Sequence, residues 1–309
     1  HQGRTLMPAV NNQAAGITQP PPGPPAFPAT TPATTTFDLP LSYTSHSTDH
    51  GAYVTANGQS DVELTAGRPV LPRTTMDLTS NVAVAHGVLM LGGSTFTDNA
   101  PFDPLVASAV ISDQVYANLA VEPQFPDPQW YPDLPVSINR TADLNNLTHQ
   151  SLVVVPAQFQ ATASTTATIG TLRQYSDLKV AVMTAPASFT DYTPPVILQS
   201  TAVATANGLQ FSAQVNDNSG AVSRVVVLYY TPPSTPGAPV TWNEADLTNN
   251  PVTGVWTSAT VPSAGGTVYY FVQAVDPSGN VSHTSLAGVT PSGAPPADTT
   301  PPLLSLIHI

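Results

Sequence analysis

Prolines recur along almost the whole chain and occupy 34 of its 309 positions, roughly twice the usual ~5%. A proline inside an α-helix removes a hydrogen bond and clashes with the preceding turn, so long helices are disfavoured. Only 8% of the residues are charged, against about 25% in a typical globular protein, and Thr, Ala, Val and Ser are abundant. Short strands joined by proline-rich turns suit this composition, and we expect a mainly β fold.

The charge balance excludes several classes of partner. The net charge is −12, from 7 basic and 19 acidic side chains, and the one lysine is Lys179. Such a chain repels nucleic acid and anionic lipid, so we expect neither as a partner. No apolar run approaches the ~18 residues of a transmembrane helix, and we expect no membrane insertion here.

The chain has no cysteine, which excludes thiol nucleophiles, Cys-ligated metals and disulfides. Together with the Thr/Pro-rich segments, this absence fits an exported bacterial or archaeal protein better than a cytosolic enzyme. We therefore expect an extracellular or cell-surface location. The chain begins at His1 rather than at a methionine, so we also expect the natural N-terminus to lie further upstream.

The N-terminal part divides into a linker and a domain. The run QPPPGPPAFPATTPATTTFDLP, from Gln19 to Pro40, cannot bury enough apolar surface to offset its ordering entropy. We expect residues 1–50 to be a Pro/Thr-rich, unstructured linker, and residues 51–190 to be a β-rich domain of unknown family. The strand order within that domain does not follow from the sequence.

Three strands can be predicted in the 51–190 domain. Asn81–Leu91 is apolar on both faces, which predicts a central strand. Ser151–Val155 and Leu178–Met183 are further predicted strands. The segment from Asp103 to about Leu119 fits either a helix or a pair of strands.

Residues 191–289 have the pattern of a β-sandwich of about 100 residues. Leu209, Phe211 and Val215 lie on one face of an alternating strand, and Asp217–Gly220 would turn directly into a second strand as a hairpin. We expect this segment to fold by itself, with those three apolar side chains and Val272 buried. The remaining predicted strands are Val222–Tyr230, Val255–Val261, Thr267–Val275 and Val281–Val289.

Three sequences in this segment resemble those of bacterial immunoglobulin-like or fibronectin type III-like modules. They are Asp191-Tyr192-Thr193-Pro194-Pro195, Asn216-Asp217-Asn218-Ser219-Gly220, and VYYFVQAVDPSGNVS from Val268 to Ser282. The resemblance covers about a third of the chain, residues 191–289, and implies a two-sheet sandwich. Val268 stands where a fibronectin type III module would place its corner tyrosine, so the looser bacterial immunoglobulin-like label fits better.

The opening motif returns as Asp298-Thr299-Thr300-Pro301-Pro302, which predicts a linker and the start of a truncated next module over residues 290–303. The last residues, LSLIHI from Leu304 to Ile309, resemble the translation of a transposon-end sequencing adapter. We expect residues 304–309 to be adapter read-through, and the chain to be a fragment of a larger protein.

No arrangement of residues predicts a catalytic or cofactor-binding site. The motifs GxSxG, GxGxxG, GxxxxGK[ST] and HExxH do not occur. Asp217 and Asp276 each follow a predicted strand and could lie at one end of the sandwich, where calcium binding is conceivable. The simpler interpretation is that each aspartate accepts hydrogen bonds from its own turn, so our prediction is no metal and no cofactor.

Histidines and aromatic residues supply the other candidates. His46 and His50 are four apart, but their Ser/Thr-rich surroundings disfavour the helix that would aim both at one metal. His86, in an apolar strand, is expected to be a hydrogen-bonded core residue rather than a base. Exposed aromatic rings would stack on sugars, whereas strand aromatics are usually core. The aromatic candidates are Trp130, Tyr131, Tyr229, Tyr230, Trp242, Trp256, Tyr269 and Tyr270.

We therefore expect a non-catalytic spacer or interaction region of a large exported prokaryotic multidomain protein. Two alternatives stay open. The region could be the accessory C-terminal part of a secreted hydrolase whose catalytic domain lies upstream, or it could itself bind glycans. Its partners would then be other proteins or extracellular glycans.

Overall fold

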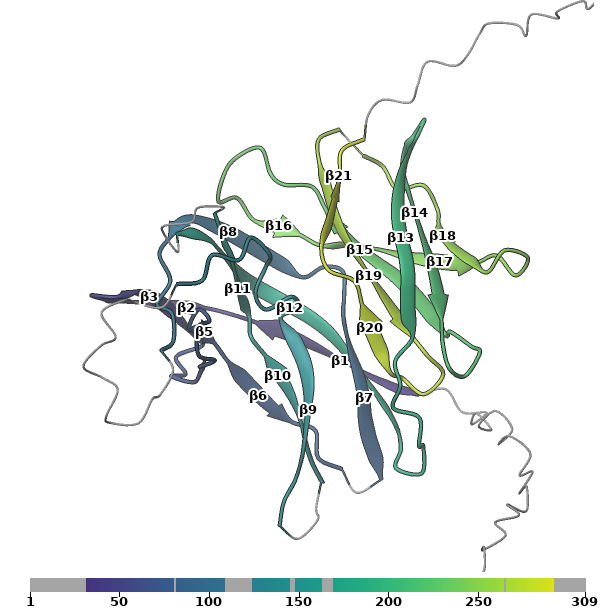
Figure 1. Ribbon diagram of the computed structural model, residues 1–309, viewed down its shortest axis with the longest axis horizontal. Helices are drawn as coiled ribbons and strands as arrows, with labels where there is room; N and C mark the ends of the chain where they lie inside the picture. The colour runs from purple at the N-terminus through teal and green to yellow at the C-terminus, as the bar shows by residue number, and fades with distance from the viewer. Residues whose placement is uncertain are drawn as a thin grey trace, which may run out of the picture.

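The computed structural model describes residues 32–80, 82–108, 124–144, 148–162, 169–263 and 265–291 (Figure 1). The regular structure in these ranges is β-strand throughout, so the mainly β fold is confirmed. Within the same ranges, no helix is long and apolar enough to cross a membrane. Residues 103–108 are not helical, and the rest of the possible helix to Leu119 lies outside the described residues. The predicted next module and adapter segment, residues 298–309, also lie outside them.

The first unit, residues 32–190, is built around one long strand, β12. Its first half pairs with β8 on one side and β11 on the other, and its second half pairs with β7 and β1. β7 and β8 follow one another along the same edge of β12, separated by a short break. The strands of this sheet in the first unit are β1 (Ala33–Pro40), β7 (Ala83–Met90), β8 (Thr95–Phe102), β11 (Ala157–Ala161) and β12 (Gly170–Pro186).

Smaller sheets complete the first unit. A three-stranded sheet has the order β6-β10-β9, and two hairpins are formed by β2 with β3 and by β4 with β5. Their bounds are β2 (Tyr43–Thr48), β3 (Gly51–Ala56), β4 (Val62–Glu63), β5 (Leu71–Pro72), β6 (Thr74–Asp77), β9 (Val136–Ala142) and β10 (Thr148–Val154).

The prediction of an unstructured linker through residue 50 is wrong for residues 33–48. Strand β1 pairs along its whole length with β12, and Phe37 and Leu39 pack against the main core. The β-branched threonines that suggested a linker suit an extended strand equally well. Apolar residues at alternate positions near the end of the Pro/Thr run were the available signal.

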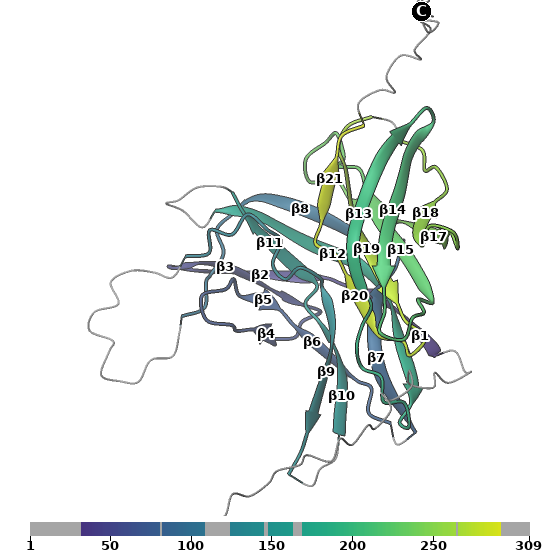
Figure 2. The same ribbon diagram turned by 45° about the vertical axis from the view of Figure 1, so that its right-hand side comes forward.

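The second unit, residues 191–291, is a β-sandwich made by one curled sheet. The strand order is β13-β14-β18-β17-β15-β19-β20, and β21 also pairs with β19. In Figure 2, β13 and β14 lie side by side in the middle of this unit, with β21 on the side nearer β2–β5 and β17 and β18 on the opposite side. The strands are β13 (Val196–Thr205), β14 (Gly208–Asn216), β15 (Arg224–Tyr230), β17 (Asn243–Asn249), β18 (Val255–Ser258), β19 (Val268–Val275), β20 (Val281–His283) and β21 (Ala287–Val289).

The predicted hairpin between β14 and β15 is wrong. β14 pairs with β13 and β18, whereas β15 pairs with β17 and β19. The Asp217–Gly220 loop therefore crosses from one layer of the sandwich to the other. Leu209, Phe211, Val215 and Val272 are 0–7% exposed in the core between these layers, which confirms their predicted burial.

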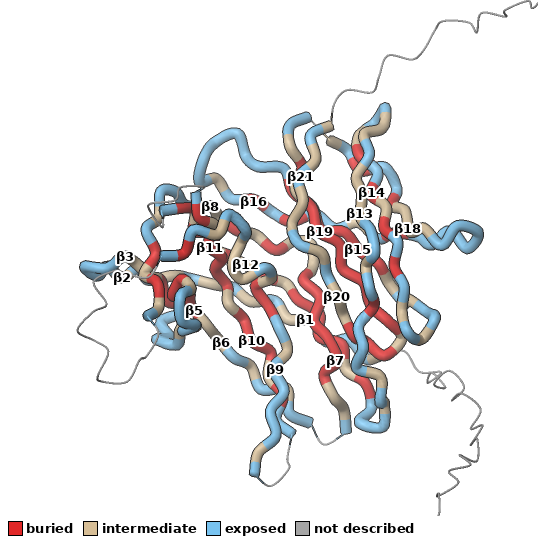
Figure 3. The backbone as a smooth tube through the Cα atoms, in the orientation of Figure 1, coloured by how far each residue is buried: buried red, intermediate tan, exposed pale blue. Residues whose placement is uncertain are grey.

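Strands β15 and β19 are buried on both faces and form a middle layer of the molecule (Figure 3). Val225 and Val227 enter the sandwich core, while Val226, Leu228 and Tyr230 enter a second core shared with the first unit. The side chains of β19 also alternate between the sandwich core and the core shared with the first unit. The expectation of a self-contained sandwich over residues 191–289 therefore needs correction, because one face of its sheet is core for both units.

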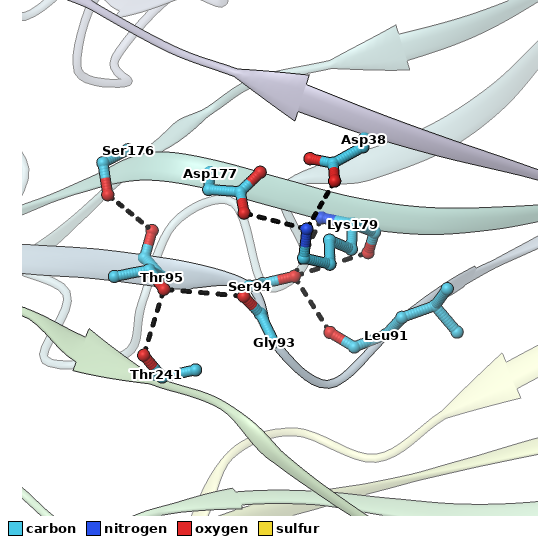
Figure 4. Close-up of polar contacts among 9 residues, drawn as sticks. All are labelled: Asp38, Leu91, Gly93, Ser94, Thr95, Ser176, Asp177, Lys179 and Thr241. Atoms are coloured by element: carbon cyan, nitrogen blue, oxygen red, sulfur yellow. Dashed lines mark hydrogen bonds and ion pairs between the residues drawn. The ribbon is translucent and has the colours of Figure 1, made fainter.

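A strand from the second unit also joins the sheet of the first. β16 (Val240–Thr241) pairs with β8, and the backbone of Trp242 exchanges two hydrogen bonds with Gly93 and Ser94, at 2.8 and 2.9 Å. The Thr95 and Thr241 hydroxyls meet beside this pairing at 3.0 Å (Figure 4).

The polar contacts in Figure 4 continue from this joint across β12. The Ser94 hydroxyl accepts a hydrogen bond from the Lys179 backbone N–H and donates one to the Leu91 carbonyl, each at 2.9 Å. The Lys179 ammonium forms ion pairs with Asp38 and Asp177. These contacts connect β1, β12 and the break between β7 and β8.

Strand β7 is buried on both faces, as predicted for a central strand. It is nevertheless an edge strand, because only one of its sides pairs with another described strand. Among the described strands it pairs with β12 alone. Two buried glutamines supply the missing partners. Gln150 of β10 accepts from the Ala85 N–H at 2.6 Å, and Gln273 of β19 accepts from the Met90 N–H and donates to the Met90 carbonyl, both at 2.9 Å.

The substitution Phe211→Ala tests the sandwich core. Phe211 is fully buried between the two layers and contacts the rings of Tyr229 and Tyr270. We expect the free energy of unfolding to fall by about 3 to 5 kcal/mol, the range for a buried phenylalanine replaced by alanine. Chemical denaturation measures this, and a loss below about 1 kcal/mol would contradict the burial.

The substitution Gln273→Leu tests the contact between the units. Leucine fills a similar volume but leaves the buried N–H and carbonyl of Met90 without partners, so we expect a loss of about 3 kcal/mol in unfolding free energy. Gln199→Leu is the matched control, because Gln199 is exposed on β13 and should change stability little. Equal effects of the two substitutions would show that the Gln273 amide is not important.

Candidate functional site

Three aspartates from separate loops meet at one end of the second unit. Asp191 precedes β13, Asp217 follows β14, and Asp276 follows β19. One carboxylate oxygen from each lies within 4.8 Å of those of the other two. In the described part of the chain, this is the one group of three or more potential metal ligands so close together.

Asp276 is the innermost member and is fully buried. Its Oδ1 accepts hydrogen bonds from the backbone N–H groups of Ser278 and Asn280, both at 2.8 Å, and its Oδ2 accepts one from the Asn280 side chain at 2.7 Å. Gly279 closes this turn with a φ of +88°, which favours glycine. Burial raises the pKa of the Asp276 carboxyl, and the nearby charges of Asp217 and Asp191 act in the same direction.

Asp191 and Asp217 are half-buried, and each uses only one carboxylate oxygen in hydrogen bonds. Asp191 Oδ1 accepts from the Thr193 N–H at 3.0 Å and from the Asn218 side chain at 3.3 Å. Asp217 Oδ1 accepts from the Ser219 N–H at 2.8 Å. The Oδ2 atoms of both aspartates are shielded from solvent and have no hydrogen-bond partner.

Asn280 connects two of the three aspartates, Asp191 and Asp276, to the first unit. Its side-chain NH₂ donates to Asp276 and to the Asp191 carbonyl, at 2.7 and 3.1 Å. Its Oδ1 lies 3.1 Å from Nδ1 of His86 on β7, and because an amide oxygen can only accept, Nδ1 is the donor. The His86 ring also stacks on Tyr192, with centroids 4.6 Å apart.

β7 comes very close to the second unit at this point. A Cβ atom at Gly87 would lie 2.5 Å from the Val281 side chain and 2.7 Å from the Gly279 carbonyl. Only glycine allows this approach. His86 is 7% exposed, and burial lowers the pKa of its ring. The prediction that His86 is a hydrogen-bonded core residue is confirmed, with a side-chain carbonyl as its partner.

The structure brings the two predicted calcium candidates, Asp217 and Asp276, together and adds Asp191 to them. Each of the two predicted residues also accepts hydrogen bonds from its own turn, as the simpler interpretation expected. Sequence reasoning missed Asp191 as a ligand because it precedes the first strand of the unit. Its place in the opening motif was the available signal.

The predicted His46 and His50 pair lies on and just after strand β2 rather than on a helix. The His46 ring stacks on Tyr53, with centroids 4.7 Å apart, and its Nε2 lies 3.0 Å from the Thr55 hydroxyl. His46 therefore makes its contacts within the hairpin formed by β2 and β3.

A cavity of about 350 Å³ lies between the two units and is lined by several of the predicted aromatic residues. Trp130 and Tyr269 line it and are half-buried, and the buried Tyr230 lies deeper. Gln129, Gln160, Asp98 and Asp133 add polar groups to its wall. Trp242 and Tyr270, by contrast, are core residues.

Arg173 forms the floor of this cavity and is almost fully buried. Its guanidinium makes two hydrogen bonds to the Asp98 carboxylate, at 2.8 and 2.9 Å, and one to the Tyr230 hydroxyl at 2.9 Å. Although burial opposes the charge, the bonds to Asp98 raise the pKa of Arg173. The guanidinium lies 4.0 Å from the centre of the Trp130 ring and fixes that ring from one side.

Comparisons with known proteins identify no family for this chain. No protein-family model matches it, and no curated protein matches it. One solved structure that matches is described as "Complex of Porphyromonas gingivalis RgpB pro- and mature domains". The matched chain is 15% identical, the match covers 52% of this chain and 84% of that one, and the TM-score is 0.35.

Proposed function

We propose that residues 32–291 form a rigid, non-catalytic region of a larger exported protein and hold its neighbouring domains at a fixed spacing. The observation that carries this proposal is the middle layer, in which β15 and β19 are core for both units. Rotation of one unit against the other would expose Leu228, Phe271 and Trp242 to water. Two units that share a core in this way hold the neighbouring domains at a fixed distance better than two modules joined by a flexible linker would.

We also propose that the second unit is a bacterial immunoglobulin-like or fibronectin type III-like module. Strands β13, β14 and β18 face strands β17, β15, β19 and β20, which is similar to the two-layer arrangement of such modules. The turn sequences named above support the same assignment. The cysteine-free, weakly charged composition supports an extracellular or cell-surface location.

The role as a spacer can be tested in the complete protein. We expect that replacing residues 32–291 with an unrelated, rigid pair of β-sandwiches of similar length preserves the activity and surface display of the parent protein. A Gly/Ser linker with the same number of residues should impair both, because it fixes no distance.

Antibody labelling of intact cells measures display, and recovery of the whole gene identifies the activity to assay. Loss of function with the rigid replacement would mean that the region has a specific binding or catalytic role. A catalytic domain upstream would identify the region as the accessory part of a secreted hydrolase.

A second candidate function, the binding of a neutral glycan, is favoured by the cavity between the units. Aromatic rings that are backed on one face are suited to stacking on sugar rings. Arg173 backs Trp130, and Tyr230 stacks on Tyr269 with centroids 5.3 Å apart. Because Asp98 neutralises Arg173 and the chain is acidic, a neutral sugar suits the cavity better than an anionic one.

Affinity electrophoresis in gels containing soluble β-glucan, xylan or glycol chitin tests this candidate. We expect retardation by at least one of these polysaccharides, and its loss in Trp130→Ala. Trp256→Ala is the control, because Trp256 is a half-buried tryptophan on β18 outside the cavity. Thermal unfolding checks that both variants fold, and no retardation of the unaltered chain on any of the three gels would exclude binding to these glycans.

A further inference from the structure

We propose that Asp191, Asp217 and Asp276 bind a Ca²⁺ ion, and that this ion strengthens the contact between the two units. The three side chains come from three loops that are far apart in the sequence. Their carboxylate oxygens nevertheless lie within 4.8 Å of one another, close enough to share one ion.

The unpartnered oxygens are a second observation that points to a ligand. Buried polar atoms almost always have a hydrogen-bond partner. The Oδ2 atoms of Asp191 and Asp217 are both shielded from solvent and both lack one, while the Oδ1 atoms of the same side chains are held by backbone or amide donors. Each carboxylate is thus fixed in orientation by one oxygen and has the other available for a cation.

The local charge also lacks compensation. In the described residues, none of the three aspartates forms an ion pair with a lysine, arginine or histidine. Asp276 is fully buried beside two further carboxylates, and buried carboxylates are normally paired with a cation or coordinate a metal. A bound divalent cation would supply the missing positive charge.

The donor atoms favour Ca²⁺ over other ions. All three candidate ligands are carboxylate oxygens, whereas Zn²⁺ and other transition metals favour nitrogen or sulfur. His86 contacts Asn280, but neither of its ring nitrogens belongs to the group of ligand atoms that lie within 4.8 Å of one another. The half-buried positions of Asp191 and Asp217 leave room for water ligands, and Ca²⁺ accepts six to eight oxygens in a flexible geometry where Mg²⁺ requires an octahedron.

The position of the cluster connects the ion to the interface of the units. Asn280 contacts Asp276, the Asp191 carbonyl and His86, and β7 packs against the Gly279 turn beside it. An ion that holds the three loops together would also hold Asn280 in the position that it needs to meet His86. We therefore expect calcium to stabilise the two units together.

Isothermal titration calorimetry on the full chain, freed of metal with EDTA, tests the proposal. CaCl₂ should bind at one saturable site and raise the unfolding temperature, and equal MgCl₂ should raise it less. Asp217→Asn keeps the size of the side chain and should weaken calcium binding by about tenfold or more. Asp61→Asn is the matched control, because Asp61 is exposed outside the cluster and its substitution removes the same charge.

Asp276→Asn should abolish binding. If that variant does not fold, Asp217→Asn decides, because Asp217 lies at the half-buried side of the cluster. Absence of calcium binding to the unaltered chain, unchanged binding in Asp217→Asn, or equal stabilisation by calcium and magnesium would each overturn the proposal.

Discussion

The architecture depends on a pair of neighbouring strands, β15 and β19, that are apolar on both faces. In strands β15 and β19, neighbouring residues point in opposite directions, and both directions lead into a core. Val227 packs toward β14, while Leu228 packs toward the first unit. A strand with two apolar faces cannot remain at the surface, so it must be covered twice. The first unit provides the second cover.

Because of this constraint, the boundary near residue 190 separates two units with different strand arrangements, and one hydrophobic core is shared by both. Phe96 of β8 contacts Tyr230 and Trp242 of the second unit, with ring centroids 5.2 and 5.9 Å apart. Strand β16 adds backbone pairing to the same joint. Without the first unit, the second would expose a large aromatic and aliphatic surface, which is usually a site of association.

The sequence predicted the β class, the burial of Phe211 and Val272, and the turn that ends β19, because all of these depend on local patterns. Strand pairing was harder to predict. Asp217–Gly220 contains the residues of a tight hairpin, but the loop joins two layers, since Phe211 and Val227 must face each other across a core. Residues 33–40 looked like a linker because their pairing partner, β12, lies far away in the sequence.

The candidate site also combines residues that local sequence patterns predict with a residue that the three-dimensional arrangement brings in. Asp217 and Asp276 could be proposed from the turns that they begin. Asp191 had only its place in the opening motif as a signal, and the convergence of the three loops adds it to the cluster. The orphaned oxygens of Asp191 and Asp217 depend on three-dimensional shielding and have no signature in the sequence. The role of Asn280 as a bridge to His86 likewise joins segments from the two units.

The hydrophobic effect has no direction, so it does not by itself align polar groups across two apolar layers in contact. The Gln273 amide adds a directional contact. It donates to and accepts from the same residue, Met90, so a shift of β19 by one position along β7 would break both bonds at once. This polar side chain therefore helps to fix the register of β19 on β7, together with the backbone pairing of β16 with β8 and the contact between Asn280 and His86.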